Sequence, residues 1–218
     1  ISVWGRDGSI CAIGALFSRD DKVRRAGITT LRNLARHQAD NGQIPSYLLL
    51  DDDDRISEVV YGGLGNVTTI DSNLWFLIPA QTAFSRASRE EFINDEFMAV
   101  YERVFRHLRS LDSDSCGLLE IPAAGDWSDI LDRSYHVLYD EVLWYRALRC
   151  AAILSRVRGR EERAAAYDRW AVLVHDRLNG QFWWTPEAIR DCVDQYFLAN
   201  AIPDDDEMPW YQSHLKPF

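Results

Sequence analysis

The pattern of apolar and polar positions along the chain predicts two kinds of helix in alternation. Three segments have apolar residues at helical spacing and an opposite face rich in Arg and Glu, which is typical of amphipathic helices. Ser88 and Glu91 have capping-box spacing ahead of the second segment, and Asn179 with Gly180 predicts the end of the third. The apolar faces consist of Val23, Gly27, Leu31, Leu34 and Gln38; of Ile93, Phe97, Val100, Val104, Leu108 and Leu111; and of Ala164, Tyr167, Ala171, Val174 and Leu178.

The second kind of helix is apolar nearly all round, and it occurs over residues 10–17, 74–80 and 142–154. Such a helix is expected to be buried on every side. Pro79 lies inside the second of these segments and predicts a kink or an early end there. The chain therefore reads as an inner helix followed by an outer helix, three times over.

A repeated pair of helices predicts an all-α fold of stacked helical hairpins, either a solenoid or a closed double ring of helices. Long loops over residues 41–70 and 112–139 lead into the inner helices and hold Gly, Pro, Asp and Trp. Long loops gathered on one face usually carry the functional site. We therefore expect the site where the inner helices begin.

Composition narrows the class of protein. With 218 residues and 47% hydrophobic content, the chain can form one domain or part of a larger one. The net charge of −10 argues against a nucleic-acid partner. No apolar run is long enough to cross a bilayer and no leader precedes Trp4, so we expect a cytoplasmic protein without a membrane partner. Because it lacks an initial Met and stops after an aromatic loop, we expect truncation at both ends.

Metal and cofactor signals are weak. Cys11, Cys116, Cys150 and Cys192 are widely spaced and are expected to be free, mostly buried thiols. The five histidines lack the HExxH or HxH spacing of a metal site, so neither a metal nor a cofactor is predicted. The acidic runs at 51–54 and 204–207 are more typical of solvated loops. A magnesium-dependent isoprenoid synthase that uses Asp51 to Asp54 remains an alternative.

Carboxylates and tryptophans recur together where the inner helices are expected to begin. The first group is Trp4, Arg6 and Asp7, the second runs from Asp71 to Trp75, and the third runs from Asp140 to Trp144. Carboxylates accept hydrogen bonds from sugar hydroxyls, and indole rings pack against the C–H faces of sugars. The grouping predicts a carbohydrate site, although an aspartate at a helix start is often an N-cap.

Five segments resemble the amylo-α-1,6-glucosidase and glycogen-debranching family of glycoside hydrolases. They are WGRD at 4–7, GQIPS at 42–46, IDSNLWF at 70–76, GDWSD at 125–129 and LYDEVLWYRAL at 138–148. The resemblance implies a six-hairpin (α/α)6 toroid, of which residues 1–218 would supply about three hairpins. The chain would then be the N-terminal half of the catalytic domain, with the rest of its own barrel as its partner.

The resemblance also implies roles for particular residues. Asp71 is expected to be the general acid of an inverting hydrolase that acts on α-glucosidic linkages in an oligosaccharide or α-glucan, with the catalytic base in the missing C-terminal part. The substrate-binding residues are expected to be Trp4, Arg6, Asp7, Trp75, Asp126, Trp127, Glu141 and Trp144.

A non-enzymatic helical-repeat binding module is the alternative from another class. In that interpretation the acidic residues are helix caps. The enzyme interpretation instead requires Asp7, Asp71 and Glu141 to converge in one pocket.

Overall fold

The computed structural model describes residues 1–63, 67–86, 94–128, 133–183, 185–187 and 190, without the side chains of 80 and 83–86. The chain divides into two compact units, Ile1–Gly180 and Gln181–Phe218, and the first carries the helices and strands discussed below. Cys192 and the acidic run at 204–207 lie outside the described residues. Among the described helices, none has both the length and the apolar content that a membrane crossing requires.

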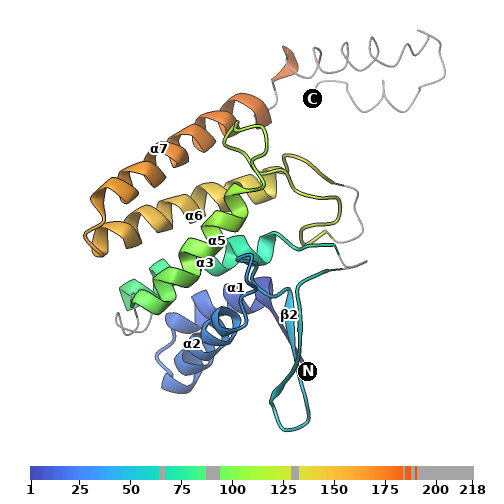
Figure 1. Cartoon of the computed structure of the whole chain (residues 1–218), viewed down its shortest axis with the longest axis vertical. Coiled ribbons are helices and arrows are strands. Elements are labelled where there is room, and N and C mark those ends of the chain that lie inside the picture. Colours follow the sequence, from blue (N-terminus) through green and yellow to red (C-terminus); the bar gives the residue numbers. More distant parts are fainter. Residues whose placement is uncertain (64–66, 87–93, 129–132, 184, 188–189, 191–218) are drawn as a thin grey trace, which may run out of the picture. The chain divides into compact units, whose positions relative to one another are not determined.

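In its described residues the first unit is mainly helical and contains three helical hairpins (Figure 1). They are α1 (Gly5–Leu16) with α2 (Asp21–Arg36), α3 (Asp71–Arg86) with α5 (Asp95–Arg109), and α6 (Leu138–Val157) with α7 (Glu161–Arg177). The prediction of alternating helices is confirmed at this level.

A small sheet accompanies the helices, and the all-α prediction missed it. It consists of β1 (Ser2–Trp4), β2 (Tyr47–Leu50) and β3 (Ile56–Val60), paired antiparallel in that order. The four acidic residues at 51–54 form the exposed turn between β2 and β3, where the Asp51 carboxylate accepts hydrogen bonds from the Asp53 and Arg55 N–H groups. This is the solvated loop that the sequence favoured.

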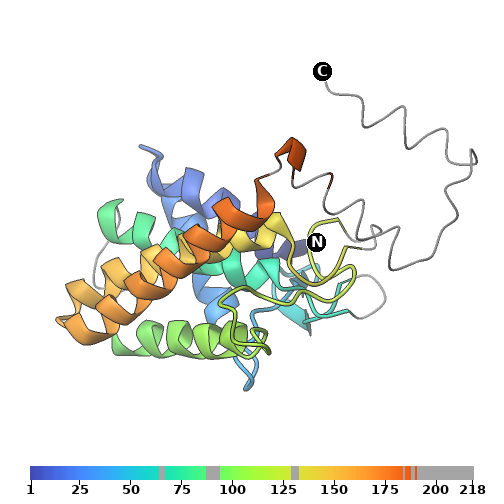
Figure 2. The same cartoon turned by 90° about the horizontal axis from the view of Figure 1, so that it is seen from above.

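The helices form an inner and an outer layer. α3 packs between α1 and α6, while α2 packs on α1 and α7 packs on α6. Figure 2 shows α5 beside the α6–α7 pair, where the Phe105 ring lies 4.9 Å from that of Tyr167. α5 also contacts the residues that follow α2, where Arg103 Nε donates a hydrogen bond to Gln38 Oε1 at 2.6 Å. The inner layer is therefore α1, α3 and α6, and the outer layer is α2, α5 and α7.

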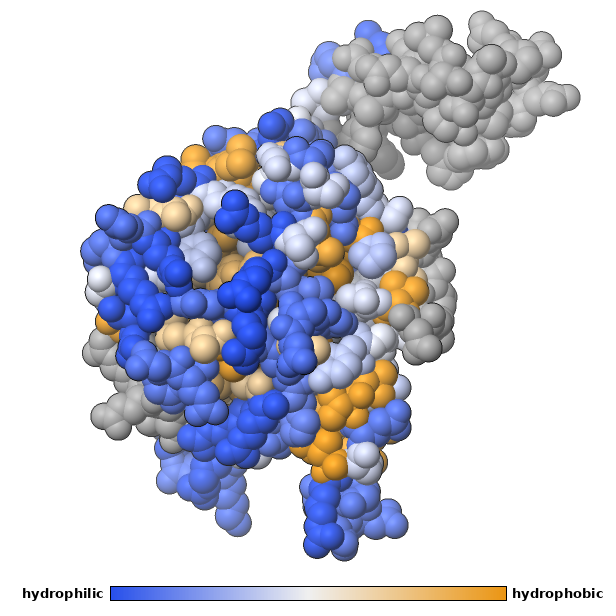
Figure 3. Space-filling view, in the orientation of Figure 1, coloured by the Kyte–Doolittle hydropathy of each residue, from blue (hydrophilic) through white to orange (hydrophobic). Residues whose placement is uncertain are grey.

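The outer helices bury the faces that their apolar spacing predicted, including Leu31 and Leu34 on α2, and Val104 and Leu108 on α5. On the face seen in Figure 3, hydrophilic residues predominate over the outer helices. Val23, however, is 43% exposed at the start of α2.

The predicted helix ends fare less well. α5 is capped by Asn94, whereas Ser88 and Glu91 lie outside the described residues. α7 itself ends at Arg177, two residues before the predicted stop at Asn179 and Gly180, but a π-helical turn, Leu178–Phe182, follows it directly and passes through that position.

The inner helices differ from one another in burial. α3 continues through Pro79 to Arg86, so the proline does not end it, and its residues 71–79 are almost all buried. α1 and α6 are not buried on every side, since Ile10 is 41% exposed and Val142 is 48% exposed. The cause is their position at the two sides of α3, where no described element covers their remaining apolar face.

The GQIPS segment at 42–46 joins the starts of two inner helices. The Gly5 N–H donates to the Ser46 carbonyl at 2.7 Å, and the Ile44 N–H donates to Asn73 Oδ1 at 2.9 Å. A Cβ on Gly5 would lie 2.3 Å from the Pro45 carbonyl oxygen, so this contact requires glycine. The segment therefore fixes the N-terminal ends of α1 and α3 relative to each other.

Close packing between α1 and α2 gives a first prediction. In Gly27→Ala the new Cβ would lie 2.8 Å from Ala15 Cβ, whereas the Cβ of Gly14→Ala meets no atom within 4 Å. Both substitutions gain the roughly 1 kcal/mol of helix propensity that alanine has over glycine. We expect Gly27→Ala to be less stable than Gly14→Ala by about 1–3 kcal/mol, the usual cost of overpacking. Denaturant unfolding measures the difference, and equal stabilities would contradict this packing.

Candidate active site at the inner helix ends

Asp71 is the first residue of α3 and its side chain is 1% exposed. The preceding Ile70 N–H donates to the Gly125 carbonyl at 2.8 Å, which ties the helix start to the loop after α5. Burial raises the pKa of Asp71 to about 6, although the nearby Arg6 guanidinium opposes the rise. Near neutral pH this carboxyl group therefore exists in both protonation states.

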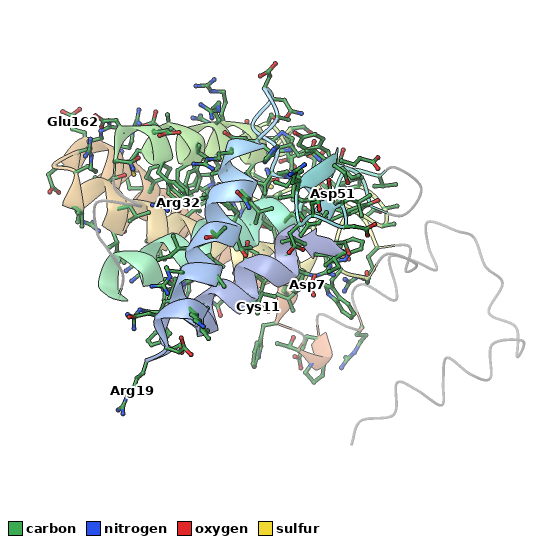
Figure 4. The ribbon with its side chains drawn as sticks, turned by 90° about the horizontal axis from the view of Figure 1, so that it is seen from below. Asp7, Cys11, Arg19, Arg32, Asp51 and Glu162 are labelled. Carbon is green, nitrogen blue, oxygen red and sulfur yellow. The ribbon has the colours of Figure 1, made fainter. Side chains whose placement is uncertain are left out.

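Arg6 links two of the predicted site residues. Its guanidinium contacts the Asp71 carboxylate at 3.1 Å and the Asp7 carboxylate at 3.2 Å. Asp7 itself is mostly exposed in the first turn of α1, and Figure 4 shows it one turn before Cys11. Cys11 is exposed, so the expectation of a buried thiol is wrong for this residue. Asp7 and Asp71 are thus joined through a shared arginine.

Asp126 lies in the loop between α5 and α6 and is held as an anion. Its carboxylate accepts from the Ser128 N–H at 2.8 Å and from the Ser128 hydroxyl at 2.7 Å, and it pairs with Arg133 at 2.5 Å. Burial alone would raise the pKa of Asp126, but the hydrogen bonds from Ser128 and Arg133 together lower it. Asp126 therefore carries a negative charge at neutral pH.

Asp140 is fully buried in the first turn of α6. Burial raises the pKa of Asp140 to about 9, and the charges of Asp126 and Asp71 raise it further. Among the described residues, neither carboxylate oxygen of Asp140 has a hydrogen-bond donor. Asp140 is therefore a neutral carboxylic acid at neutral pH. Asp71, Asp126 and Asp140 interact electrostatically, and we call them the carboxyl cluster.

Aromatic side chains adjoin the carboxyl cluster. Trp75 Nε1 donates to the Tyr139 hydroxyl at 2.7 Å, and Tyr139 interacts electrostatically with Asp71 and Asp140. The Trp127 ring lies edge-on to the Tyr139 ring at 6.3 Å and is half exposed. Trp4 is also partly exposed and packs on Tyr47 with ring centroids 4.6 Å apart. Trp75 and Trp127 therefore adjoin the buried acids through Tyr139.

Glu141 and Trp144 are buried and bond to the loop between α5 and α6. Among the described residues no contact joins Glu141 to Asp7 or Asp71, so their convergence in one pocket stays a prediction. Glu141 is buried and accepts from the Leu119 N–H at 2.7 Å. Burial raises the pKa of Glu141 to about 8. Trp144 is fully buried against Trp170. The helical rotation of about 100° per residue explains the difference, because it turns Glu141 away from the direction of Asp140.

The capping alternative accounts for little of this arrangement. The N-cap residues of α1 and α6 are Trp4 and Val137, and neither makes a side-chain capping hydrogen bond. Asp7 and Asp140 lie inside their helices, in the first turn. Acidic residues in the first turn interact favourably with the helix dipole, but that interaction does not require burial of Asp140.

Arg133 and Tyr139 were not among the predicted site residues, and Asp140 belongs to one of the carboxylate-and-tryptophan groups without an assigned role. Asp140 and Glu141 are adjacent acids, and the choice between them depends on the rotational phase of α6, which is set by its packing on α3. Arg133 is five residues beyond Ser128, and only the folded loop brings its Nε within 3.0 Å of the Ser128 hydroxyl.

No family model matches the chain, and no match was found among curated proteins.

The buried Asp140 gives a second prediction. The folded protein keeps a proton on Asp140 up to about pH 9, whereas an unfolded chain releases it near pH 4. Folding stability is therefore lost as the pH rises through this range, by about 1.4 kcal/mol per pH unit for one such group. We expect Asp140→Asn to reduce the pH slope of the unfolding free energy by about that amount between about pH 6 and 8.

Denaturant unfolding at a series of pH values measures this slope. Asp52→Asn, in the exposed β2–β3 turn, is the matched control and should leave the slope as in the wild type. An unchanged slope in Asp140→Asn would show that Asp140 is ionised in the folded protein.

Proposed function

We propose that the protein is an inverting glycoside hydrolase that acts on α-glucosidic linkages of an oligosaccharide or α-glucan, with Asp71 as the general acid. The observation that carries the proposal is the burial of Asp71 at a helix start, with a pKa raised to about 6 beside Arg6. A general acid works best when its pKa lies near the working pH. Burial is the usual means of raising a carboxyl group to that range.

In the proposed reaction, Asp71 donates its proton to the glycosidic oxygen as the bond to the anomeric carbon breaks. Asp71 is already almost fully buried, and this burial raises its pKa, which favours the protonated form. Arg6 opposes that rise and keeps the acid strong enough to release its proton. Burial thus keeps the proton on Asp71 before the reaction, and Arg6 favours its transfer to the glycosidic oxygen.

The neighbouring groups suit a neutral, hydroxylated ligand. The exposed Asp7 carboxylate offers an acceptor to sugar hydroxyls, while the buried Asp126 anion is already paired with Ser128 and Arg133. Asp140 is fully buried, so as a carboxylic acid it can share its proton with the neighbouring Asp126 rather than with a ligand. The partly exposed rings of Trp4 and Trp127 offer flat surfaces to the C–H faces of sugar rings. A nucleic acid or another polyanion would be repelled by these carboxylates.

Inversion requires a second carboxylate about 6.5–9.5 Å from the acid to activate water on the opposite face of the sugar. We place this base in the second half of a six-hairpin ring, of which α1 to α7 would be the first half. The order of inner and outer helices supports such a ring, and so do the exposed apolar side chains of Ile10 and Val142 on the two flanking inner helices. The remaining hairpins would cover these side chains.

Two other functions have less support. A helical scaffold with capping acids does not account for three buried carboxyl groups that interact electrostatically, because Asp140 lies inside the first turn of α6 and Asp126 lies in a loop. An isoprenoid synthase needs acids that face an aromatic cavity, whereas Asp51 to Asp54 line an exposed hairpin turn.

The proposed acid gives a third prediction. In the protein that carries the complete ring, Asp71→Asn should lower kcat on α-linked glucans by about 10²–10⁴, the usual contribution of a general acid. The loss should be much smaller on an aryl α-glucoside with an acidic phenol, because that leaving group needs little protonation. Initial rates on both substrates measure the contrast, and NMR should show β-glucose as the first product.

Asp7→Asn is the matched control, because it removes an exposed carboxylate that shares Arg6 with Asp71. We expect it to raise KM with a much smaller effect on kcat. Wild-type turnover of α-glucans by Asp71→Asn would refute the assignment of the acid. An equal loss on both substrates would mean that Asp71 does not act through protonation of the leaving group.

A further inference from the structure

A second cluster of reactive side chains lies in the loop between α5 and α6, separate from the carboxyl cluster. It consists of Asp114, Cys116 and His136, whose candidate ligand atoms all lie within 4.8 Å of one another. Cys116 Sγ and His136 Nε2 are 3.7 Å apart. In the part of the chain that the structure describes, no other group of three such residues is as close.

The loop that carries Asp114 and Cys116 is anchored by buried contacts. The Gly117 N–H donates to both carboxylate oxygens of Asp112 at 3.1 Å. The Gly117 carbonyl accepts from the indole N–H groups of Trp144 at 3.2 Å and Trp170 at 3.1 Å. Gly117 has φ +94°, and an added Cβ would lie 2.6 Å from the Leu173 side chain. The backbone next to Asp114 and Cys116 is therefore fixed in position.

His136 is brought to the loop by a short backbone bridge. The Ile121 N–H donates to the Tyr135 carbonyl at 2.8 Å, and the Tyr135 N–H donates to the Ile121 carbonyl at 2.7 Å. The His136 ring then lies with Nδ1 3.1 Å from the Leu119 carbonyl oxygen. A carbonyl oxygen only accepts hydrogen bonds, so Nδ1 carries a hydrogen, and Nε2 is the ring nitrogen that faces Cys116. Metal-binding histidines are typically oriented in this way.

We propose that Asp114, Cys116 and His136 bind one Zn²⁺ ion through a carboxylate oxygen, the thiolate and Nε2, with water as the fourth ligand. Zn²⁺ takes S, N and O ligands in a tetrahedron, with bonds of about 2.0–2.3 Å, which places neighbouring S and N ligands roughly 3.6 Å apart. The 3.7 Å between Sγ and Nε2 matches this spacing before any movement. A thiolate and an imidazole favour Zn²⁺ over Mg²⁺ or Ca²⁺.

The buried Glu141 helps to hold the backbone at Leu119, which orients His136. Its carboxylate accepts from the Leu119 N–H at 2.7 Å, on the same residue whose carbonyl faces His136 Nδ1. A bound ion would join residues 114–116 to His136 across the segment that contains Asp126. The ion would therefore stiffen a loop that contributes to the carboxyl cluster, and its binding does not depend on the proposed glycosidase reaction.

Titration of the reduced 218-residue chain with Zn²⁺, followed by calorimetry, tests this inference. We expect one equivalent to bind saturably and the melting temperature to rise with Zn²⁺ concentration, as it does for any ligand of the folded state. Cys116→Ser and His136→Asn should each weaken binding at least tenfold. Cys11→Ser is the matched control, because it removes an exposed thiol on α1, and it should bind Zn²⁺ as the wild type does.

Co²⁺ provides a second readout on the wild-type protein, which does not depend on the folding of any variant. Binding through Cys116 should give a sulfur-to-cobalt charge-transfer band and the intense visible bands of tetrahedral cobalt. Absence of a one-to-one Zn²⁺ complex would refute the site. Loss of binding in Cys11→Ser, unchanged binding in Cys116→Ser, or a cobalt complex without the charge-transfer band would refute it as well.

Discussion

Removal of carboxyl groups from water at the ends of the inner helices is the constraint on which the proposed chemistry depends. Asp71 and Asp140 are almost fully buried, and loss of hydration raises the pKa of each. Asp126 is buried as well, but the N–H and hydroxyl of Ser128, together with Arg133, keep it charged. The three buried carboxyl groups therefore differ in charge, according to the hydrogen-bond donors around each. Asp71 is an acid with a pKa of about 6, Asp140 is neutral and Asp126 is an anion.

The core of the molecule holds these groups in place through the backbone rather than through the acids themselves. The Ile70 N–H bonds to Gly125, Ile44 bonds to Asn73, and the start of α1 bonds to Ser46. Each contact joins a helix start to a loop from elsewhere in the sequence. Burial of a charged group costs stability, so a site of this kind needs a scaffold that is fixed independently of it.

The same loop between α5 and α6 serves both proposals. Asp126 and Arg133 belong to the carboxyl cluster, while Asp114, Cys116 and His136 form the proposed Zn²⁺ site. Glu141 connects the two sites. It follows Asp140 in α6, and it accepts a hydrogen bond from the N–H of Leu119, whose carbonyl oxygen faces His136 Nδ1. An anchored loop can therefore position two chemically different groups at once.

The amino-acid sequence determined the three helical hairpins, because their apolar spacing has the period of a helix and needs no knowledge of neighbours. It also identified Asp71 and Asp126 as acids beside tryptophan. Tertiary structure decided the rest. The rotation of α6 about its axis placed Asp140 rather than Glu141 in the carboxyl cluster and buried Trp144. The folded loop brought Arg133 and His136 next to partners elsewhere in the sequence. Local spacing fixes which residues share a helix face, but only packing decides what that face meets.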